Sequence, residues 1–255
     1  MFPLKDNIPT DRFPVVTVAL IVANVLMYLF FQEALSSSFA NSPDEANVVE
    51  YGAIPYEFSH PGEGCAISGQ NLVCGEGAPD QAPTWLTALT SMFMHGSLLH
   101  IGGNMLFLWI FGNNVEDSMG KVKFIVFYLL GGIAALAAQV LVGPNAPVPT
   151  VGASGAVAGV LGGYLLLFPR ARVVTVIFIV FFFTILELPA LLILGFWFVQ
   201  QVLFGYFDFV NPTGGEGGVA YFAHIGGFVF GLLAIKLFAN NVHEDYDRAH
   251  RLPVY

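Results

Sequence analysis

Charged residues are scarce in this sequence: Lys, Arg, Asp and Glu make up 11% of its 255 residues, against about 25% in soluble domains. Hydrophobic residues account for 56%, and the mean hydropathy is +0.70. This composition excludes a disordered chain, a basic nucleic-acid-binding protein and an ordinary soluble enzyme. It predicts an all-α polytopic protein surrounded by the lipid bilayer.

Long apolar segments account for most of the chain. A helix that crosses a bilayer needs about 20 apolar residues, and we predict six crossings, at residues 14–32, 85–115, 124–142, 153–168, 188–207 and 218–235. The first lacks a small-residue cleavage site and is therefore not a signal peptide. Residues 173–186 are too few to cross comfortably, so we expect them to lie along the inner interface or to lengthen the next helix with tilt.

Positive charge is missing from the predicted outer loop, residues 36–84. With six crossings, all nine Lys and Arg residues fall on the opposite side of the membrane. Because cytoplasmic loops collect Lys and Arg, we expect both termini in the cytoplasm, in a multi-pass protein of the plasma membrane. No internal repeat or second domain is evident, so residues 1–255 are interpreted as one membrane domain.

Cysteine is nearly absent, since the chain has only Cys65 and Cys74, both in the predicted outer loop. Two cysteines are too few for a disulfide scaffold. In an oxidising compartment they would form one small bridged loop, and otherwise they would be two free thiols. No Cys/His spacing typical of a metal site surrounds them, and we expect neither a metal nor a cofactor.

Polar residues inside the second predicted span are candidates for function, because unpaired polar groups in hydrocarbon are costly. His100 and Asn104 are four residues apart and share one helix face. If the helix is continuous, His95 lies about 140° away and points elsewhere. Hydrogen bonding between helices is the alternative role of these side chains. Glu116, at the inner end of this span, is interpreted as a cap or loop organiser.

Ser154 and His224 lie in the fourth and the last predicted spans. Ser154 begins a helix between Gly152 and Gly155, where a serine either caps the helix or serves as an accessible nucleophile. His224 precedes a Gly227–Gly231 seam, which predicts close packing on the fourth span. At 1.5 Å per residue, Ser154 lies roughly 24 Å from Arg170 and His224 roughly 18 Å from Lys236. Both therefore fall in the outer half of the membrane, as a Ser–His pair requires.

Three segments together resemble the rhomboid family of intramembrane serine proteases: HGSLLHIGGNMLFLWIFGNNVED from His95, GASG from Gly152, and AHIGGFVFG from Ala223. The resemblance covers about residues 85–240 and implies a six-helix rhomboid fold. It further implies a catalytic Ser–His dyad in a cavity open to the outside, with transmembrane proteins as substrates, cleaved near the outer membrane edge.

The resemblance also implies a role for each motif residue. Ser154 would be the nucleophile and His224 the general base, while His100 and Asn104 would join the Ser154 N–H in an oxyanion hole. The supporting positions are His95, Gly152, Gly155 and Glu116. The chain departs from some relatives in two ways. Ala158 replaces an aromatic residue that stacks on the catalytic histidine, so His224 must be oriented otherwise, and the Trp-Arg motif of the first loop is absent.

Other functions fit the sequence less well. A metal-dependent intramembrane protease would need H-E-x-x-H, which is missing from the sequence. An aspartyl protease would need two aspartates inside the spans, and no Asp lies well inside any predicted span. A transporter or metal channel using the histidines would lack carboxylate or Cys ligands. A catalytically inactive rhomboid-like protein that binds membrane proteins is the main alternative. The oligomeric state and the identity of the substrate are not predicted.

Overall fold

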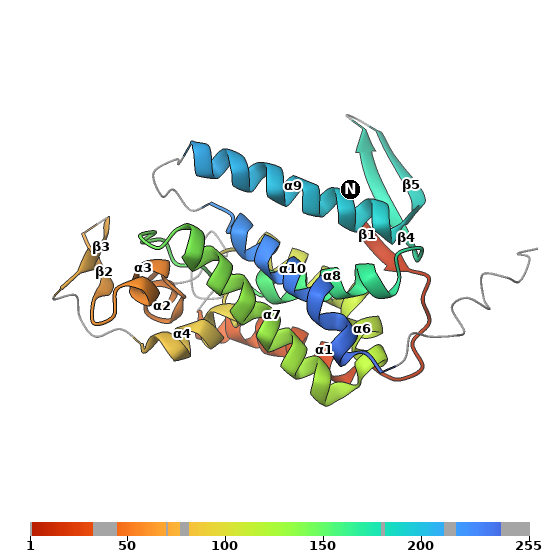
Figure 1. Ribbon diagram of the computed structural model, residues 1–255, viewed down its shortest axis with the longest axis horizontal. Helices are drawn as coiled ribbons and strands as arrows, with labels where there is room; N and C mark the ends of the chain where they lie inside the picture. The colour runs from red at the N-terminus through yellow and green to blue at the C-terminus, as the bar shows by residue number, and fades with distance from the viewer. Residues whose placement is uncertain are drawn as a thin grey trace, which may run out of the picture.

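The computed structural model describes residues 2–32, 45–69, 71–76, 82–179, 182–211 and 218–240. Within these residues the protein is mostly helical (Figure 1). The helices are α1 (Val15–Leu26), the π-helix η1 (Met27–Phe31), α2 (Glu45–Tyr51), α3 (Pro55–Ser59), α4 (Thr84–Thr90), the 3-10 helix η2 (Ser91–Phe93), α5 (Leu98–Phe107), the π-helix η3 (Leu108–Gly112), α6 (Asn113–Met119), α7 (Lys121–Val142), α8 (Ser154–Leu167), α9 (Ala190–Val210) and α10 (Tyr221–Phe238). The strands are β1 (Phe2–Asp6), β2 (Gly64–Ser68), β3 (Asn71–Gly75), β4 (Arg172–Ile179) and β5 (Phe182–Pro189).

Three helices, α7, α9 and α10, are long and apolar enough to cross a bilayer, and residues 15–31 and α8 form shorter apolar helices. The protein is therefore an integral membrane protein, whereas the six crossings stay a prediction. The predicted second span is broken into α4, η2, α5, η3 and α6. Arg248 and Arg251, which contribute to the predicted cytoplasmic tail, lie outside the described residues, as does part of the outer loop.

Helix α8 is the centre of the bundle, and almost all of its residues are buried. Small residues allow α10 to approach it closely. A Cβ added at Gly227 or Gly231 would collide with the carbonyl oxygens of Gly155 or Gly159. The predicted seam between the two helices is thus confirmed, and it fixes the spacing of their backbones.

Glu116 on α6 caps the start of α1. Its carboxylate accepts hydrogen bonds from the N–H groups of Val16 and Thr17 at 3.0 and 2.8 Å, and from the Thr17 hydroxyl at 2.8 Å. The first N–H groups of a helix have no partner within the helix, and a carboxylate satisfies them with favourable charge. Glu116 therefore joins two segments about one hundred residues apart in the chain.

Residues 172–189 form a β-hairpin, and this corrects both the all-α expectation and the interfacial or helical segment predicted at 173–186. Strands β4 and β5 pair antiparallel, and β1 adds to the other edge of β4 to give the order β1-β4-β5. The segment is rich in Val, Ile and Phe, which favour strands, and an apolar run of this length does not distinguish a strand from a helix by periodicity.

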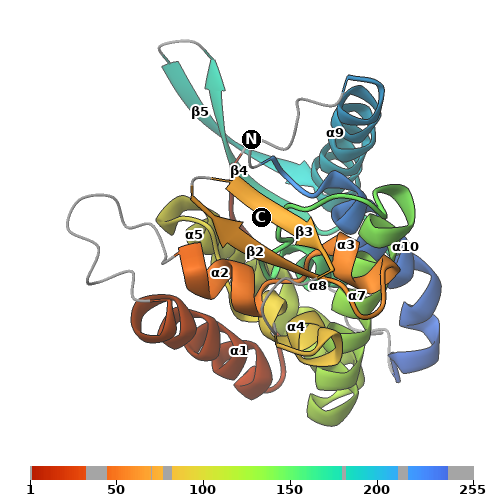
Figure 2. The ribbon, with the colours of Figure 1, turned by 90° about the vertical axis from the view of Figure 1, so that its left-hand side faces the viewer.

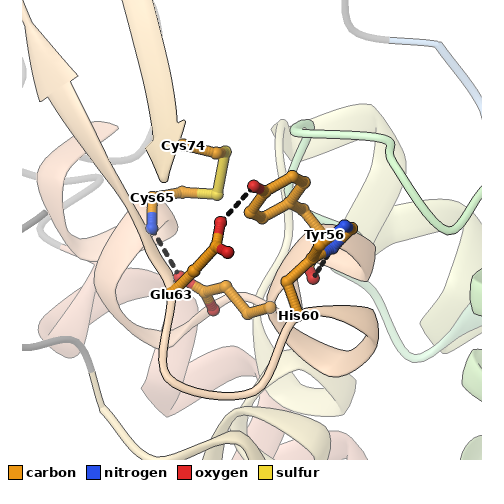
Figure 3. Close-up of a disulfide and its surroundings, with 6 residues drawn as sticks. Tyr56, His60, Glu63, Cys65 and Cys74 are labelled. Atoms are coloured by element: carbon orange, nitrogen blue, oxygen red, sulfur yellow. Dashed lines mark hydrogen bonds between the residues drawn. A yellow bond between two sulfur atoms is a disulfide. The ribbon is translucent and has the colours of Figure 1, made fainter. Parts of the chain in front are cut away.

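The described part of the outer loop forms a small unit of α2, α3 and the hairpin β2–β3, at the end of the molecule opposite to β4–β5 (Figures 1 and 2). Cys65 and Cys74 face each other across the hairpin and form a disulfide, so the bridged alternative is confirmed. Glu57 accepts a hydrogen bond from the Cys65 N–H at 3.0 Å, and Tyr56 donates one to Glu63 (Figure 3).

This outer unit is attached to the loop that leads into α8. Ala53 and Thr150 exchange backbone hydrogen bonds of 3.3 and 2.7 Å, and the Tyr56 N–H donates to the Ala146 carbonyl at 3.1 Å. Gly52 also packs against this loop, since a Cβ added there would lie 3.0 Å from side-chain atoms of Pro149 and Val151. The outer unit therefore holds the loop that precedes Ser154.

Candidate active site

Ser154 and His224 are brought together by the close packing of α8 and α10. The His224 Nε2 lies 2.8 Å from the Ser154 Oγ, a hydrogen-bonding distance, although 70 residues separate them. Ala153 occupies the N-cap position of α8, and no side chain caps this helix. Ser154 is thus not a capping residue, and its hydroxyl is paired with the imidazole.

The other ring nitrogen of His224 faces helix α9. Its Nδ1 lies 2.8 Å from the Oε1 of Gln201, which is buried. The indole of Trp197, one helical turn before Gln201, packs at a tilt of 36° with its ring centre 5.8 Å from that of the imidazole. His224 is therefore held on both edges and one face, although position 158 carries no aromatic ring.

Asn104 lies on α5 and lines a cavity that Ser154 and His224 also line. It is 9% exposed, and its Nδ2 has no hydrogen-bond partner within the described residues. Buried amide groups are nearly always hydrogen-bonded, so this donor is available to water or to a bound group in the cavity.

His100, one turn before Asn104, presents its Nε2 edge to the loop before the serine. Its Nδ1 accepts a hydrogen bond from the Gly96 N–H at 3.4 Å, so the ring proton is on Nε2. A Cβ added at Gly152 would lie 2.8 Å from that nitrogen and 3.5 Å from the Ser154 Oγ. Gly152 also has a φ of +130°, where L side chains are strained. Glycine at this position is what allows the imidazole to approach the serine.

His95 lies beside His100, which corrects the expectation that it points elsewhere. The two rings meet edge to face with centres 5.1 Å apart. The expectation assumed one continuous helix, but α5 begins at Leu98 with Ser97 as its N-cap. His95 is fully buried, and its Nε2 accepts a hydrogen bond from the Ala153 N–H at 3.4 Å.

The backbone of His95 is in turn held by Gln32, at the end of η1. The Gln32 side chain accepts a hydrogen bond from the His95 N–H at 2.8 Å and donates one to its carbonyl at 3.1 Å. Because His95 contacts both Ala153 and His100, this amide fixes a residue that touches two sides of the candidate site.

Ser154, His224, His100 and Asn104 all line one cavity of about 1460 Å³. Its walls also include Gly152, Gly155 and Trp197. Residues of the outer unit, such as Pro55 and Ile67, line it as well. The cavity is large enough for an extended stretch of polypeptide beside the hydroxyl.

Three residues near the site were not predicted from the sequence: Gln201, Trp197 and Gln32. Gln201 and its neighbour Gln200 are the two amides of a largely apolar span. Polar residues in such a span are a signal of function or of helix pairing, and Trp197 precedes Gln201 by one turn. Glu116, on α6, caps the start of α1 and is not in contact with Ser154 or His224 among the hydrogen bonds of the described residues. No group of three or more His, Cys, Asp or Glu side chains suited to a metal occurs among the described residues.

Comparison with known proteins supports the family that the three motifs resemble. The family model for the Rhomboid domain matches residues 82–241. The chain is 32% identical over 168 residues to Rhomboid protein 1, mitochondrial, of Saccharomyces cerevisiae, covering 60% of this chain and 42% of that protein. It is 37% identical over 81 residues to Rhomboid protease GluP of Bacillus subtilis, covering 32% of this chain and 15% of that protein.

A third relative is Presenilin-associated rhomboid-like protein, mitochondrial, of Homo sapiens, which is 32% identical over 100 residues, 38% of this chain and 26% of that protein. The chain thus spans less than half the length of these three curated relatives. Two of them are mitochondrial by name, which does not fit the plasma membrane predicted above. Because the family model matches well over half of the sequence, the chain belongs to the rhomboid family.

Proposed function

We propose that this protein is an intramembrane serine endopeptidase that cleaves single-span membrane proteins. The observation that carries the proposal is the 2.8 Å contact between the Ser154 Oγ and the His224 Nε2 at the wall of a cavity. A serine hydroxyl is a weak nucleophile until an adjacent base takes its proton, and an imidazole nitrogen within hydrogen-bonding reach is such a base.

In the first step the Ser154 oxygen attacks the carbonyl carbon of the scissile peptide bond, and the hydroxyl proton passes to His224. The carbonyl oxygen becomes negatively charged. The Nδ2 of Asn104 and the Nε2–H of His100 are the side-chain donors for this oxyanion. As the first residue of α8, Ser154 contributes a backbone N–H without a partner in the helix. Preorganised donors of this kind lower the barrier substantially.

In the second step His224 returns the proton to the leaving amine, and the C–N bond breaks. Water then attacks the acyl carbon while His224 takes one of its protons. When the bond to the Ser154 oxygen breaks, His224 gives that proton to this oxygen, which releases the second product and regenerates Ser154. No metal or cofactor takes part. His95, Gly152 and Gly155 support this geometry. His95 holds Ala153, Gly152 admits His100, and Gly155 admits Ala135 of α7 while its carbonyl lies against Gly227 of α10.

The substrate must present an unwound backbone to the cavity, because the amides of a helix are already hydrogen-bonded. The Lys and Arg pattern favours a cavity that opens on the face of the membrane that lacks these residues, with both termini on the other face. Two relatives are mitochondrial by name. We therefore propose cleavage at the membrane face that lacks Lys and Arg, without assigning the protein to the plasma membrane.

The proposal is tested by cleavage of a single-span substrate in liposomes. The wild-type protein should release a fragment cut near the membrane edge, and Ser154→Ala should release none at comparable folding. Ser118→Ala, which removes a buried hydroxyl bonded to the Val115 carbonyl, is the matched control and should cleave normally. Cleavage by Ser154→Ala at the wild-type rate would exclude it as the nucleophile. A folded wild-type protein that binds such substrates without cutting them would favour the inactive rhomboid-like alternative.

A further inference from the structure

We infer that Gln201 is a positioning residue for His224: it holds the imidazole in the tautomer that can accept the Ser154 proton. This inference rests on the proposed function and adds a third member, contributed by α9, to the pair on α8 and α10. It is based on the chain of contacts Ser154, His224, Gln201, in which each neighbouring pair is joined by a hydrogen bond of 2.8 Å.

The direction of the two hydrogen bonds follows from the acceptors. The Gln201 atom that faces the ring is Oε1, which has lone pairs and no proton, so Nδ1 must carry the proton and donate it. A neutral imidazole has one N–H, which leaves Nε2 as an acceptor facing the Ser154 hydroxyl. With the opposite tautomer, Nε2 would donate to Ser154 and could not take its proton.

The surroundings make this hydrogen bond a strong constraint. Gln201 and His224 are 6% and 9% exposed, so the unsatisfied Oε1 would be left in a low-dielectric environment if the ring turned away. An unpaired buried acceptor costs about 1–3 kcal/mol. Trp197 lies on the same face of α9, four residues earlier, and blocks rotation of the ring on one side.

Gln201 also differs chemically from the aspartate of a Ser-His-Asp triad. A neutral amide accepts the Nδ1–H in the same way but cannot neutralise the imidazolium that forms after proton transfer. It therefore fixes orientation and tautomer without adding a charge to the apolar interior, where an ionised carboxylate would be costly. This arrangement explains how His224 is oriented when position 158 is alanine and its Nδ1 faces an amide rather than a carboxylate.

The test compares three variants in the liposome cleavage assay. Gln201→Met keeps the length of the side chain and removes the acceptor, Gln201→Glu keeps an acceptor oxygen, and Gln200→Met changes the half-buried neighbour on α9 as a matched control. We expect Gln201→Met to lower kcat roughly 10- to 100-fold with KM changed by less than about twofold, which marks loss of a transition-state contribution. Gln201→Glu should recover most of that loss, and Gln200→Met should resemble the wild type.

Wild-type kcat in Gln201→Met would overturn the positioning role. So would a Gln201→Glu variant that melts at the wild-type temperature and is as slow as Gln201→Met. A direct measurement covers the case in which Gln201→Met does not fold: ¹⁵N NMR of the imidazoles in the wild type, with His224→Ala to assign the signal. The proton of His224 should be on Nδ1, and a signal showing it on Nε2 would overturn the inference. Ser154→Ala separates the two levels, because its full activity would overturn the proposed function itself, whatever Gln201 does.

Discussion

The Gly231 backbone lies directly against the Gly159 carbonyl, with no room for a Cβ between α10 and α8. The same seam continues to Gly227 and Gly155, the neighbour of Ser154. The distance between Ser154 and His224 therefore depends on glycines that carry no chemistry, because they set how closely the two helices approach.

Gly231→Ala should push α10 away from α8 and lower both thermal stability and cleavage. We expect a loss of about 1–3 kcal/mol, the range for overpacking a tight interior contact. Gly195→Ala on α9 is the matched control, since nothing lies within 4 Å of its added Cβ, and it should be neutral or slightly stabilising. Melting temperatures of the two variants in one detergent make the comparison, and equal melting temperatures would show that the seam tolerates a methyl group.

Asn104→Ala should slow cleavage by roughly 10²–10³-fold, the loss typical of one oxyanion donor. Since Nδ2 has no partner within the described residues, its removal should not lower the melting temperature appreciably. Leu98→Ala, an exposed position on the same helix, serves as control and should keep the wild-type rate. If Asn104→Ala instead lost stability and kept its turnover, the side chain would be a packing element of α5.

A buried carboxyl links the N-terminal strand to the far end of α8. The Asp6 Oδ2 accepts hydrogen bonds from the Tyr164 hydroxyl at 2.6 Å and from the Asn114 Nδ2 at 2.7 Å. Burial raises the pKa of Asp6 from 3.8 to about 6, while the Tyr164 hydrogen bond opposes this rise. The folded protein holds the Asp6 proton more tightly than the unfolded chain does. The contribution of Asp6 to stability therefore falls as the pH rises from about 4 to about 6, and it is constant at higher pH.

Tyr164→Phe should therefore destabilise the protein more at pH 8 than at pH 5. A hydrogen bond to an ionised carboxylate contributes about 1.5–3 kcal/mol, against about 0.5–1.5 kcal/mol to a neutral acid. Unfolding at the two pH values measures the difference. In an Asp6→Asn background the cost of Tyr164→Phe should be the same at both, and a pH-independent cost in the Asp6 protein would contradict the assignment.

Local motifs in the sequence were sufficient to select the candidate residues Ser154 and His224. Spacing marked Ser154, between two glycines, and His224, beside a glycine seam, as candidates, and the resemblance to rhomboid motifs implied their roles. The seam itself is present in the structure. The all-α prediction was wrong at residues 172–189, because a run of Val, Ile and Phe is equally apolar in a strand and in a helix.

Contacts made between helices were not predictable in the same way. Gln201 meets His224 only because α9 packs beside α10, and nothing in the single sequence specifies that contact. His95 was misplaced for a local reason: Ser97 starts a new helix, so the angle computed for a continuous helix did not apply. Gln201 required the packing of two helices, whereas His95 required the position at which one helix begins.

Covalent labelling tests most directly whether Ser154 is a nucleophile activated by His224. A fluorophosphonate probe reacts with activated serines, and mass spectrometry locates the adduct. We expect a single adduct on Ser154 in the wild type and none in His224→Ala at equal folding and exposure time. An unlabelled Ser154 in a protein that still cleaves its substrate, or equal labelling of wild type and His224→Ala, would contradict it.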